Sequence, residues 1–235
     1  MAQAVLFDLD NTLHDFESSC KKGLEAVAQV YPDILGTAPL DDLYDLYFRL
    51  LEQTYEAFLR GGTTLEGSRV ARMQAFLAHW GREASHHEAA EAYRVYRATY
   101  VLGRRAYPEV TEVLEALNQT HRLAIVSNGT REEQEECAWQ IGASPFIEFV
   151  LTPDQEGSPK PDPAMIRIAA ARLGVDLKQV TMVGDSWRSD VGAALAAGVR
   201  AVWLNRGGRE CPDPGKAVEI LDLRALPTLL HAHGL

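Results

Sequence analysis

Two patterns of hydrophobic and polar residues divide the chain. From residue 14 to about 105, apolar residues recur at helical spacing, and from about 106 onward short apolar runs alternate with helical stretches. A short, continuous apolar run is typical of a strand that is covered on both faces, as in a parallel sheet. On this pattern the predicted strands are 4–7, 123–126, 149–151, 180–183 and 201–204.

Helices are predicted where apolar residues repeat every three to four positions. The stretch 40–60 shows this best, because Leu43, Leu46 and Leu50 line one face of a helix. Thr130 and Glu133 are spaced as a capping box at the start of a later helix. The predicted helices are 15–30, 40–60, 66–80, 86–102, 109–118, 131–141, 162–173 and 189–197.

The order of these elements predicts an α/β fold. Strands that alternate with helices form right-handed βαβ units and a parallel sheet. The first strand is separated from the others by the long helical stretch, which therefore appears as an insertion. We expect a core domain of residues 1–13 and 106–235, and a helical cap domain of residues 14–105 that closes over the site.

Composition narrows the class of protein. Hydrophobic residues are 46% and charged residues 24% of the chain, which is typical of a globular protein rather than a disordered or membrane protein. Asp and Glu outnumber Lys and Arg by 33 to 23, so the chain should repel nucleic acid polymers. The three scattered cysteines fit reduced thiols, and the N-terminus lacks a signal-peptide pattern, so we expect a cytoplasmic protein without membrane association.

Polar residues follow four of the predicted strands. Open parallel sheets bind ligands beyond the carboxyl ends of their strands, so these residues should converge on one crevice. They are Asp8, Asp10 and Thr12, then Ser127, Asn128 and Gly129, then Lys160, and finally Asp185 and Asp190. Four carboxylates against one lysine favour a bound cation, and an all-oxygen site favours Mg²⁺.

The residue types suggest a chemistry for this crevice. Asp8 is predicted to be a nucleophile that forms an aspartyl-phosphate, and Asp10 to be the general acid and base. Lys160 would hold Asp8 and a phosphoryl oxygen. Ser127 and the backbone N–H groups of Asn128 and Gly129 would bind the remaining phosphoryl oxygens. Thr12 is predicted to lie with these phosphate-binding residues.

Four segments resemble the signatures of the haloacid dehalogenase-like (HAD) hydrolases, in the same order. Residues 7–13 (FDLDNTL) resemble the first signature and 126–129 (VSNG) the second. Residues 158–163 (SPKPDP) are similar to the third, and 183–190 (VGDSWRSD) to the fourth. The insertion between the first and second resembles the helical C1 cap of subfamily I, so the resemblance covers the whole chain.

The resemblance implies a Rossmann-like, doubly wound parallel sheet, a Mg²⁺ ion and phosphomonoester hydrolysis. By resemblance, Asp8, the carbonyl of Asp10 and Asp185 would bind the metal, and Asp190 would bind it directly or through water. The dehalogenases of the family lack the second aspartate of the first signature. Because Asp10 is present here, the resemblance favours a phosphatase.

The predicted substrate is a small phosphorylated metabolite, whose identity the sequence leaves open. Two other functions remain open as well. A sugar phosphomutase has a similar build, and a signalling protein that accepts phosphate on Asp8 would share the acidic pocket. A monomer and a homodimer are both compatible with the sequence.

Overall fold

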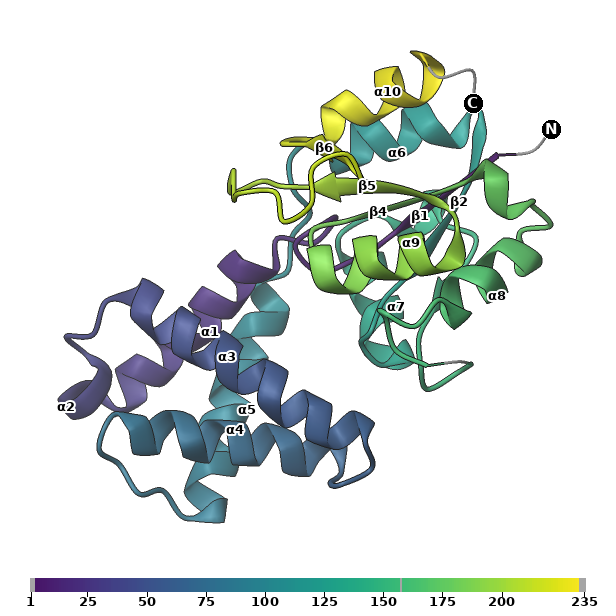
Figure 1. Ribbon diagram of the computed structural model, residues 1–235. Helices are drawn as coiled ribbons and strands as arrows, with labels where there is room; N and C mark the ends of the chain where they lie inside the picture. Colours follow the sequence, from purple (N-terminus) through teal and green to yellow (C-terminus); the bar gives the residue numbers. More distant parts are fainter. Residues whose placement is uncertain (1–2, 157, 233–235) are drawn as a thin grey trace. The chain divides into compact units, whose positions relative to one another are not determined.

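The computed structural model describes residues 3–156 and 158–232. The chain folds into two compact units, which we describe separately (Figure 1). An α/β unit contains residues up to Asp15 and from Arg105 onward, and a helical unit contains Phe16–Arg104.

A parallel sheet forms the centre of the α/β unit. Its strand order is β3-β2-β1-β4-β5-β6, and every neighbouring pair is parallel. This confirms the predicted α/β fold with a Rossmann-like sheet. The strands are β1 (Gln3–Phe7), β2 (His121–Val126), β3 (Val150–Leu151), β4 (Val180–Gly184), β5 (Arg200–Leu204) and β6 (Val218–Ile220). The edge strand β6 was not predicted, because Val-Glu-Ile is too short a run to stand out.

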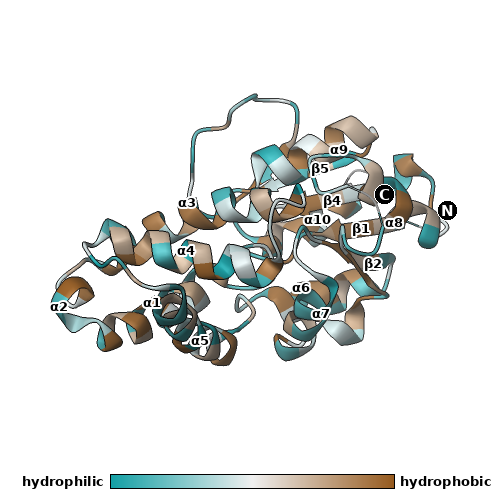
Figure 2. Ribbon diagram, turned by 90° about the horizontal axis from the view of Figure 1, so that it is seen from below, coloured by the Kyte–Doolittle hydropathy of each residue, from teal (hydrophilic) through white to brown (hydrophobic). Residues whose placement is uncertain are grey.

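Helices cover both faces of this sheet, which explains why its central strands are largely apolar. One face carries α6, α7 and α10, and the other carries α8 and α9. In Figure 2 the strands are mostly brown, whereas the helices around them carry both colours. The helices are α6 (Val110–Asn118), α7 (Arg131–Gln140), α8 (Ala164–Arg172), α9 (Gly192–Ala197) and α10 (Leu226–Ala232), with short turns at Ser144–Phe146, Leu177–Gln179, Trp187–Val191 and Leu223–Ala225.

The strand alternation of β1 divides its side chains between two cores. Val5 and Phe7 pack with α6 and α10, whereas Ala4 and Leu6 pack with α8 and α9. The strand is therefore buried on both faces and sits at the middle of the sheet, between β2 and β4. Its carboxyl end leads directly into Asp8.

The helical unit buries its own apolar core. The stripe predicted in 40–60 faces this core, since Leu43 and Leu46 are buried and Leu50 is half-buried against them. Gly23 of α1 faces the ring of Tyr96 in α5, where a Cβ would lie 2.6 Å from the Tyr96 Cδ2 atom. The helices are α1 (Phe16–Val30), α2 (Pro32–Leu35), α3 (Leu40–Leu59), α4 (Leu65–His79) and α5 (His86–Gly103).

Helix starts follow local side-chain chemistry, with one correction. A complete capping box begins α5, where Ser85 and Glu88 each bond to the other's backbone N–H. The capping box predicted at Thr130 is wrong, because the Thr130 side chain makes no cap hydrogen bond. Instead, both carboxylate oxygens of Asp154 accept from the Arg131 N–H at 3.2 Å. A residue from a distant loop thus replaces the local cap.

The boundary between the units differs slightly from the predicted one. Residues 14 and 15, assigned to the cap from sequence, belong to the α/β unit, as does Arg105. Asp15 and Arg105 are the residues at which the chain leaves the α/β unit and returns to it, and they are hydrogen-bonded to each other. The Asp15 N–H donates to the Arg105 carbonyl at 2.9 Å, and Arg105 Nε donates to Asp15 Oδ2 at 2.9 Å. His14 also forms a bridge with Ala106.

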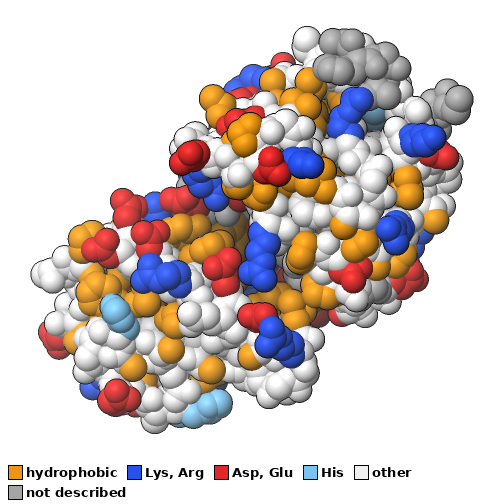
Figure 3. All heavy atoms as spheres, viewed as in Figure 1, with side chains coloured by type: hydrophobic (Ala, Val, Ile, Leu, Met, Phe, Trp, Pro, Cys, Tyr) orange, Lys and Arg blue, Asp and Glu red, His pale blue; other side chains and the backbone are white. Residues whose placement is uncertain are grey.

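Within the residues that the structure describes, each helix is too short or too polar to cross a bilayer. Acidic and basic side chains are interspersed on the face shown in Figure 3.

Candidate active site

Lys160 organises a buried cluster at the carboxyl ends of β1, β2 and β4. Its Nζ donates to Asp8 Oδ1 at 2.7 Å, to Asp190 Oδ1 at 2.7 Å and to the Val126 carbonyl at 2.6 Å. These three bonds use all three protons of the ammonium group. The side chain of Lys160 is only 1% exposed, so an apparently ordinary loop lysine is a fixed internal cation.

Asp8 stands at the tip of β1 with one free oxygen. Its N–H continues the sheet by donating to the Val183 carbonyl of β4 at 2.9 Å. Lys160 binds Oδ1, while Oδ2 has no hydrogen bond to any described residue. The side chain is 12% exposed. The carboxylate is therefore held firmly but keeps one oxygen available to a ligand.

A widened helical turn directs Asp190 into the cluster. Residues Trp187–Val191 form one turn of π-helix, and π-turns of this kind are common at functional sites. The Ser186 N–H donates to Asp190 Oδ2 at 3.0 Å. Gly184 leaves the necessary space, because a Cβ there would lie 2.2 Å from Asp190 Oδ2. Asp190 does not cap the following helix, and its two oxygens are used by Lys160 and Ser186.

The cluster carries more negative than positive charge. Burial raises the pKa of Asp8 well above its ordinary value, Lys160 opposes this rise, and Asp190 and Asp185 add to it. The pKa of Asp185 is raised to about 7, first by burial and then by Asp190. Burial lowers the pKa of Lys160, but Asp190 and Asp8 outweigh burial and raise it above its ordinary value.

This charge imbalance fits a divalent cation. Asp8, Asp185 and Asp190 each offer a carboxylate oxygen, and these oxygens lie within 4.8 Å of one another. Such an all-oxygen set with excess negative charge matches the preference of Mg²⁺. The side chain of Asp10 is not in this set, so any metal contact of Asp10 would come from its backbone carbonyl.

The carboxylate of Asp10 instead faces His14 and Gln134. His14 Nδ1 lies 2.7 Å from Asp10 Oδ1, and the ring of His14 is fully buried. Gln134 Nε2 donates to Asp10 Oδ2 at 3.4 Å. The sulfur of Cys137 lies within 4.8 Å of a carboxylate oxygen of Asp10 and of a ring nitrogen of His14. The acid–base candidate thus has different hydrogen-bond partners from Asp8 and Asp190, which share Lys160.

The predicted phosphate-binding residues of the second signature are hydrogen-bonded to Gln134, which contacts Asp10, and to Lys160, which contacts Asp8. Ser127 is buried, accepts from the Gly129 N–H at 3.2 Å and donates to Gln134 Oε1 at 3.1 Å. The side chain of Asn128 exchanges two hydrogen bonds with the backbone of Lys160. The backbone N–H of Asn128 was predicted to bind phosphate. The contact of its side chain with the Lys160 backbone was not predicted.

Comparison with known proteins agrees with this arrangement. The sequence profile of the haloacid dehalogenase-like hydrolases matches residues 2–198. The chain belongs to this HAD hydrolase family. This confirms the family resemblance of the four signatures and identifies the protein as a hydrolase.

The relatives of this HAD hydrolase include several phosphatases. The phosphoserine phosphatase of Thermus thermophilus is 38% identical over 139 residues, which cover 58% of this chain and 54% of the relative. The matched part thus spans about half of that protein. The human N-acylneuraminate-9-phosphatase is 27% identical over 95% of this chain and 93% of its own length.

Solved structures of the family share the fold. The HAD hydrolase YfnB of Bacillus subtilis, solved bound to magnesium, is 23% identical and has a TM-score of 0.79 over 97% of this chain and 98% of its own. Haloacid dehalogenases have the same fold as well. The fold alone therefore does not distinguish hydrolysis of a phosphate ester from dehalogenation.

The first signature of this HAD hydrolase contains a strained residue and an unpaired hydroxyl. Asn11 has φ of 60°, a left-handed conformation that asparagine tolerates better than most residues. Thr12 is fully buried, and its hydroxyl has no hydrogen-bond partner among the described residues. An unpaired buried hydroxyl is unusual and marks Thr12 as a group with spare bonding capacity.

Sequence reasoning missed the residues that support the cluster from neighbouring elements. Neither His14 nor Gln134 was predicted to contact Asp10. Trp203 Nε1 and Arg209 each donate to the Asp185 carbonyl at 2.9 Å. Trp203 lies inside the predicted strand 201–204, so a search of the residues that follow each strand does not find it.

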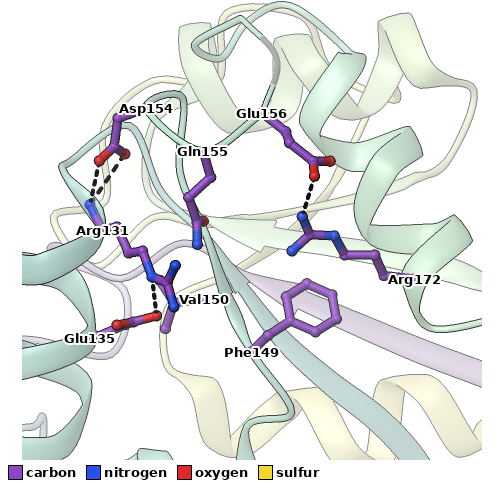
Figure 4. A pocket seen from close by; sticks show the side chains of 8 residues that line it. All are labelled: Arg131, Glu135, Phe149, Val150, Asp154, Gln155, Glu156 and Arg172. Atoms are coloured by element: carbon purple, nitrogen blue, oxygen red, sulfur yellow. Dashed lines mark hydrogen bonds and ion pairs between the residues drawn. The ribbon is translucent and has the colours of Figure 1, made fainter.

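A separate hollow of about 480 Å³ lies beside β3 (Figure 4). Its arginines are paired, Arg131 with Glu135 at 2.8 Å and Arg172 with Glu156 at 2.7 Å. None of the predicted catalytic or metal-binding residues lines it. We therefore assign the chemistry to the strand-end cluster.

Proposed function

We propose that this protein is a Mg²⁺-dependent phosphomonoester hydrolase that acts on a small phosphorylated metabolite through an aspartyl-phosphate on Asp8. The observation that carries the proposal is the fixed pair of Asp8 and Lys160, with Asp185 and Asp190 beside it and Asp10 two residues away. The phosphatases among the relatives and the magnesium in the YfnB structure support it.

The metal would be held by carboxylate oxygens of Asp8, Asp185 and Asp190. When bound, Mg²⁺ supplies positive charge that offsets these carboxylates and the phosphoryl oxygens. Lys160 adds a second, permanent positive charge through its bond to Asp8 Oδ1. Both charges favour the ionised form of Asp8, which a nucleophile requires.

In the first step, Asp8 Oδ2 attacks phosphorus and the bond from phosphorus to the leaving oxygen breaks. Asp10 donates a proton to that oxygen, so the substrate departs as an alcohol. Ser127 donates a hydrogen bond to a phosphoryl oxygen and holds the group in line.

In the second step, Asp10 takes a proton from water as the water oxygen attacks phosphorus. The bond between phosphorus and Asp8 breaks, inorganic phosphate leaves and Asp8 is restored. Over both steps one water is consumed and one alcohol is released for each phosphate ester.

A phosphate-release screen tests the proposal. Purified protein is incubated with phosphoserine, phosphoglycolate, N-acylneuraminate 9-phosphate and sugar phosphates, with Mg²⁺ or with EDTA. We expect release that requires Mg²⁺ and is lost in Asp8→Asn. The control Asp176→Asn alters an exposed carboxylate beyond the amino end of β4 and should retain full activity.

Four outcomes would contradict the proposal. Asp8→Asn could hydrolyse substrates at the wild-type rate, or EDTA could leave the rate unchanged. Alternatively, a stable phosphoprotein could form without turnover, as expected of a signalling phospho-acceptor. Isomerisation of a sugar phosphate without free phosphate would indicate a mutase instead.

A further inference from the structure

Both oxygens of the Asp10 carboxylate are contacted by residues outside the four signatures. One is His14, directly after the first signature, and the other is Gln134 in α7. His14 Nδ1 lies 2.7 Å from Oδ1, and Gln134 Nε2 donates to Oδ2 at 3.4 Å. His14 and Gln134 are buried, whereas the Asp10 side chain is 33% exposed. Because each oxygen has its own buried partner, the plane of the carboxyl group is fixed while one side of it stays open.

Gln134 makes a second contact that fixes its own orientation. Its Oε1 accepts from the hydroxyl of Ser127 at 3.1 Å. A glutamine amide has a single oxygen acceptor and a single nitrogen donor group. Since Ser127 occupies the oxygen, the nitrogen must face Asp10. The amide therefore bridges a predicted phosphate-binding residue and the predicted acid–base residue.

The backbone leaves room for this bridge. At Gly129, a Cβ would lie 2.2 Å from Gln134 Nε2 and 2.6 Å from its Cδ atom. A distance under 3 Å to an amide that is bonded at both ends cannot be relieved without breaking one of those bonds. The glycine of the second signature thus permits the close approach of Gln134, in addition to any contact with phosphate.

We propose that Gln134 is a positioning residue that couples phosphate binding at Ser127 to the orientation of Asp10. This inference rests on the proposed function. Ser127 has one hydroxyl proton, so it cannot donate fully to Gln134 and to a phosphoryl oxygen at once. When a phosphoryl group binds, the Ser127 hydroxyl therefore donates to a phosphoryl oxygen instead of Gln134 Oε1. The bond from Gln134 Nε2 to Asp10 remains.

Leaving groups of different basicity test the role of Gln134. The first substrate is p-nitrophenyl phosphate, whose leaving group departs without needing a proton, and the second is glycerol 2-phosphate, whose alkoxide needs one. In Gln134→Met, we expect kcat/KM for glycerol 2-phosphate to fall roughly ten- to hundredfold. For p-nitrophenyl phosphate we expect a change of at most about threefold.

Matched variants separate positioning from packing. Ala138→Gly weakens the same buried face of α7 one turn further on. It should lower kcat/KM equally for both substrates, or leave both values unchanged. Asp10→Asn should show the same selective loss as Gln134→Met, but larger. Gln134→Asn keeps a polar amide and withdraws it from both partners, so it provides a second test if Gln134→Met does not fold.

The outcomes are distinct. Equal losses for both substrates in Gln134→Met, or no loss in either, would overturn the inference and leave Gln134 as a packing residue. An inactive wild-type protein, or an Asp8→Asn variant with wild-type activity, would overturn the proposed function and this inference with it. A loss of kcat/KM for glycerol 2-phosphate alone in Gln134→Met, together with an inactive Asp8→Asn variant, supports the inference and the proposed function.

Discussion

Asn128 and Lys160 exchange two hydrogen bonds between loops that are 32 residues apart. Asn128 Nδ2 donates to the Lys160 carbonyl at 2.9 Å, and the Lys160 N–H donates to Asn128 Oδ1 at 2.7 Å. A short amide side chain thereby ties the loop after β2 to the backbone of the residue that holds Asp8. We expect the position of the buried ammonium to depend on this brace.

We expect Asn128→Asp to lower kcat/KM by roughly tenfold or more, because its carboxylate cannot donate to the Lys160 carbonyl and the loop should shift. Steady-state kinetics with the preferred substrate, together with thermal melting, measure the effect. The matched control Asn118→Asp changes an exposed asparagine at the end of α6. If Asn128→Asp is as active as this control, Asn128 does not position Lys160.

Lys160→Met should destabilise the protein and abolish activity. Removing the ammonium leaves Asp8 and Asp190 buried without a counter-charge, which typically costs about 3–5 kcal/mol. Urea unfolding in EDTA measures this loss. Lys178→Met, at an exposed position, should change the free energy of unfolding by less than about 0.5 kcal/mol. A Lys160→Met variant that unfolds like wild type would contradict the central role of this ion pair.

Gly184→Ala should displace Asp190. The added Cβ would lie 2.2 Å from Asp190 Oδ2, so the carboxylate must leave Lys160 or the strand must move. We expect a loss of about 1–3 kcal/mol in stability and weaker Mg²⁺ binding, measured by urea unfolding and calorimetric titration. At Gly207 a Cβ meets its nearest atom at 3.9 Å, so Gly207→Ala is the tolerated control. Unchanged Mg²⁺ affinity in Gly184→Ala would argue against Asp190 as part of the metal site.

Stability without metal should fall as the pH rises towards 7. Asp185 has a pKa of about 7 in the folded protein against an ordinary value of 3.8. The folded state therefore binds more protons than the unfolded state between these values. This contribution is complete below about pH 4 and is lost as the pH rises through about 7. Asp8, whose pKa is also raised, acts in the same direction.

Urea unfolding in EDTA at a series of pH values measures this dependence. Asp185→Asn should have a shallower slope than wild type, because it removes one of the contributing groups. Saturating Mg²⁺ should also flatten the slope, because a bound cation favours the ionised carboxylates. If wild type and Asp185→Asn have the same slope in EDTA, the raised pKa of Asp185 is not present in the folded protein.

Residue pattern alone predicted much of the fold. Five strands of the sheet were predicted from apolar runs, because a central parallel strand is covered on both faces and must be apolar throughout. The short β6 was missed, since two of its three residues are exposed and carry no such pattern. The start of α7 was assigned the wrong cap, because Asp154 reaches it from another loop.

What the sequence by itself determined is the set of candidate residues and their place at strand ends: Asp8 and Asp10 after β1, Ser127 after β2, and Asp185 after β4. These positions depend on chain connectivity and strand alternation, which are local. Only the tertiary structure decided how the groups are used. Lys160 became a buried cation with three partners, Asp190 joined it through a π-turn, and His14 and Gln134 took hold of Asp10. The reason is that these contacts join residues from separate elements, and their distances arise only when the elements pack.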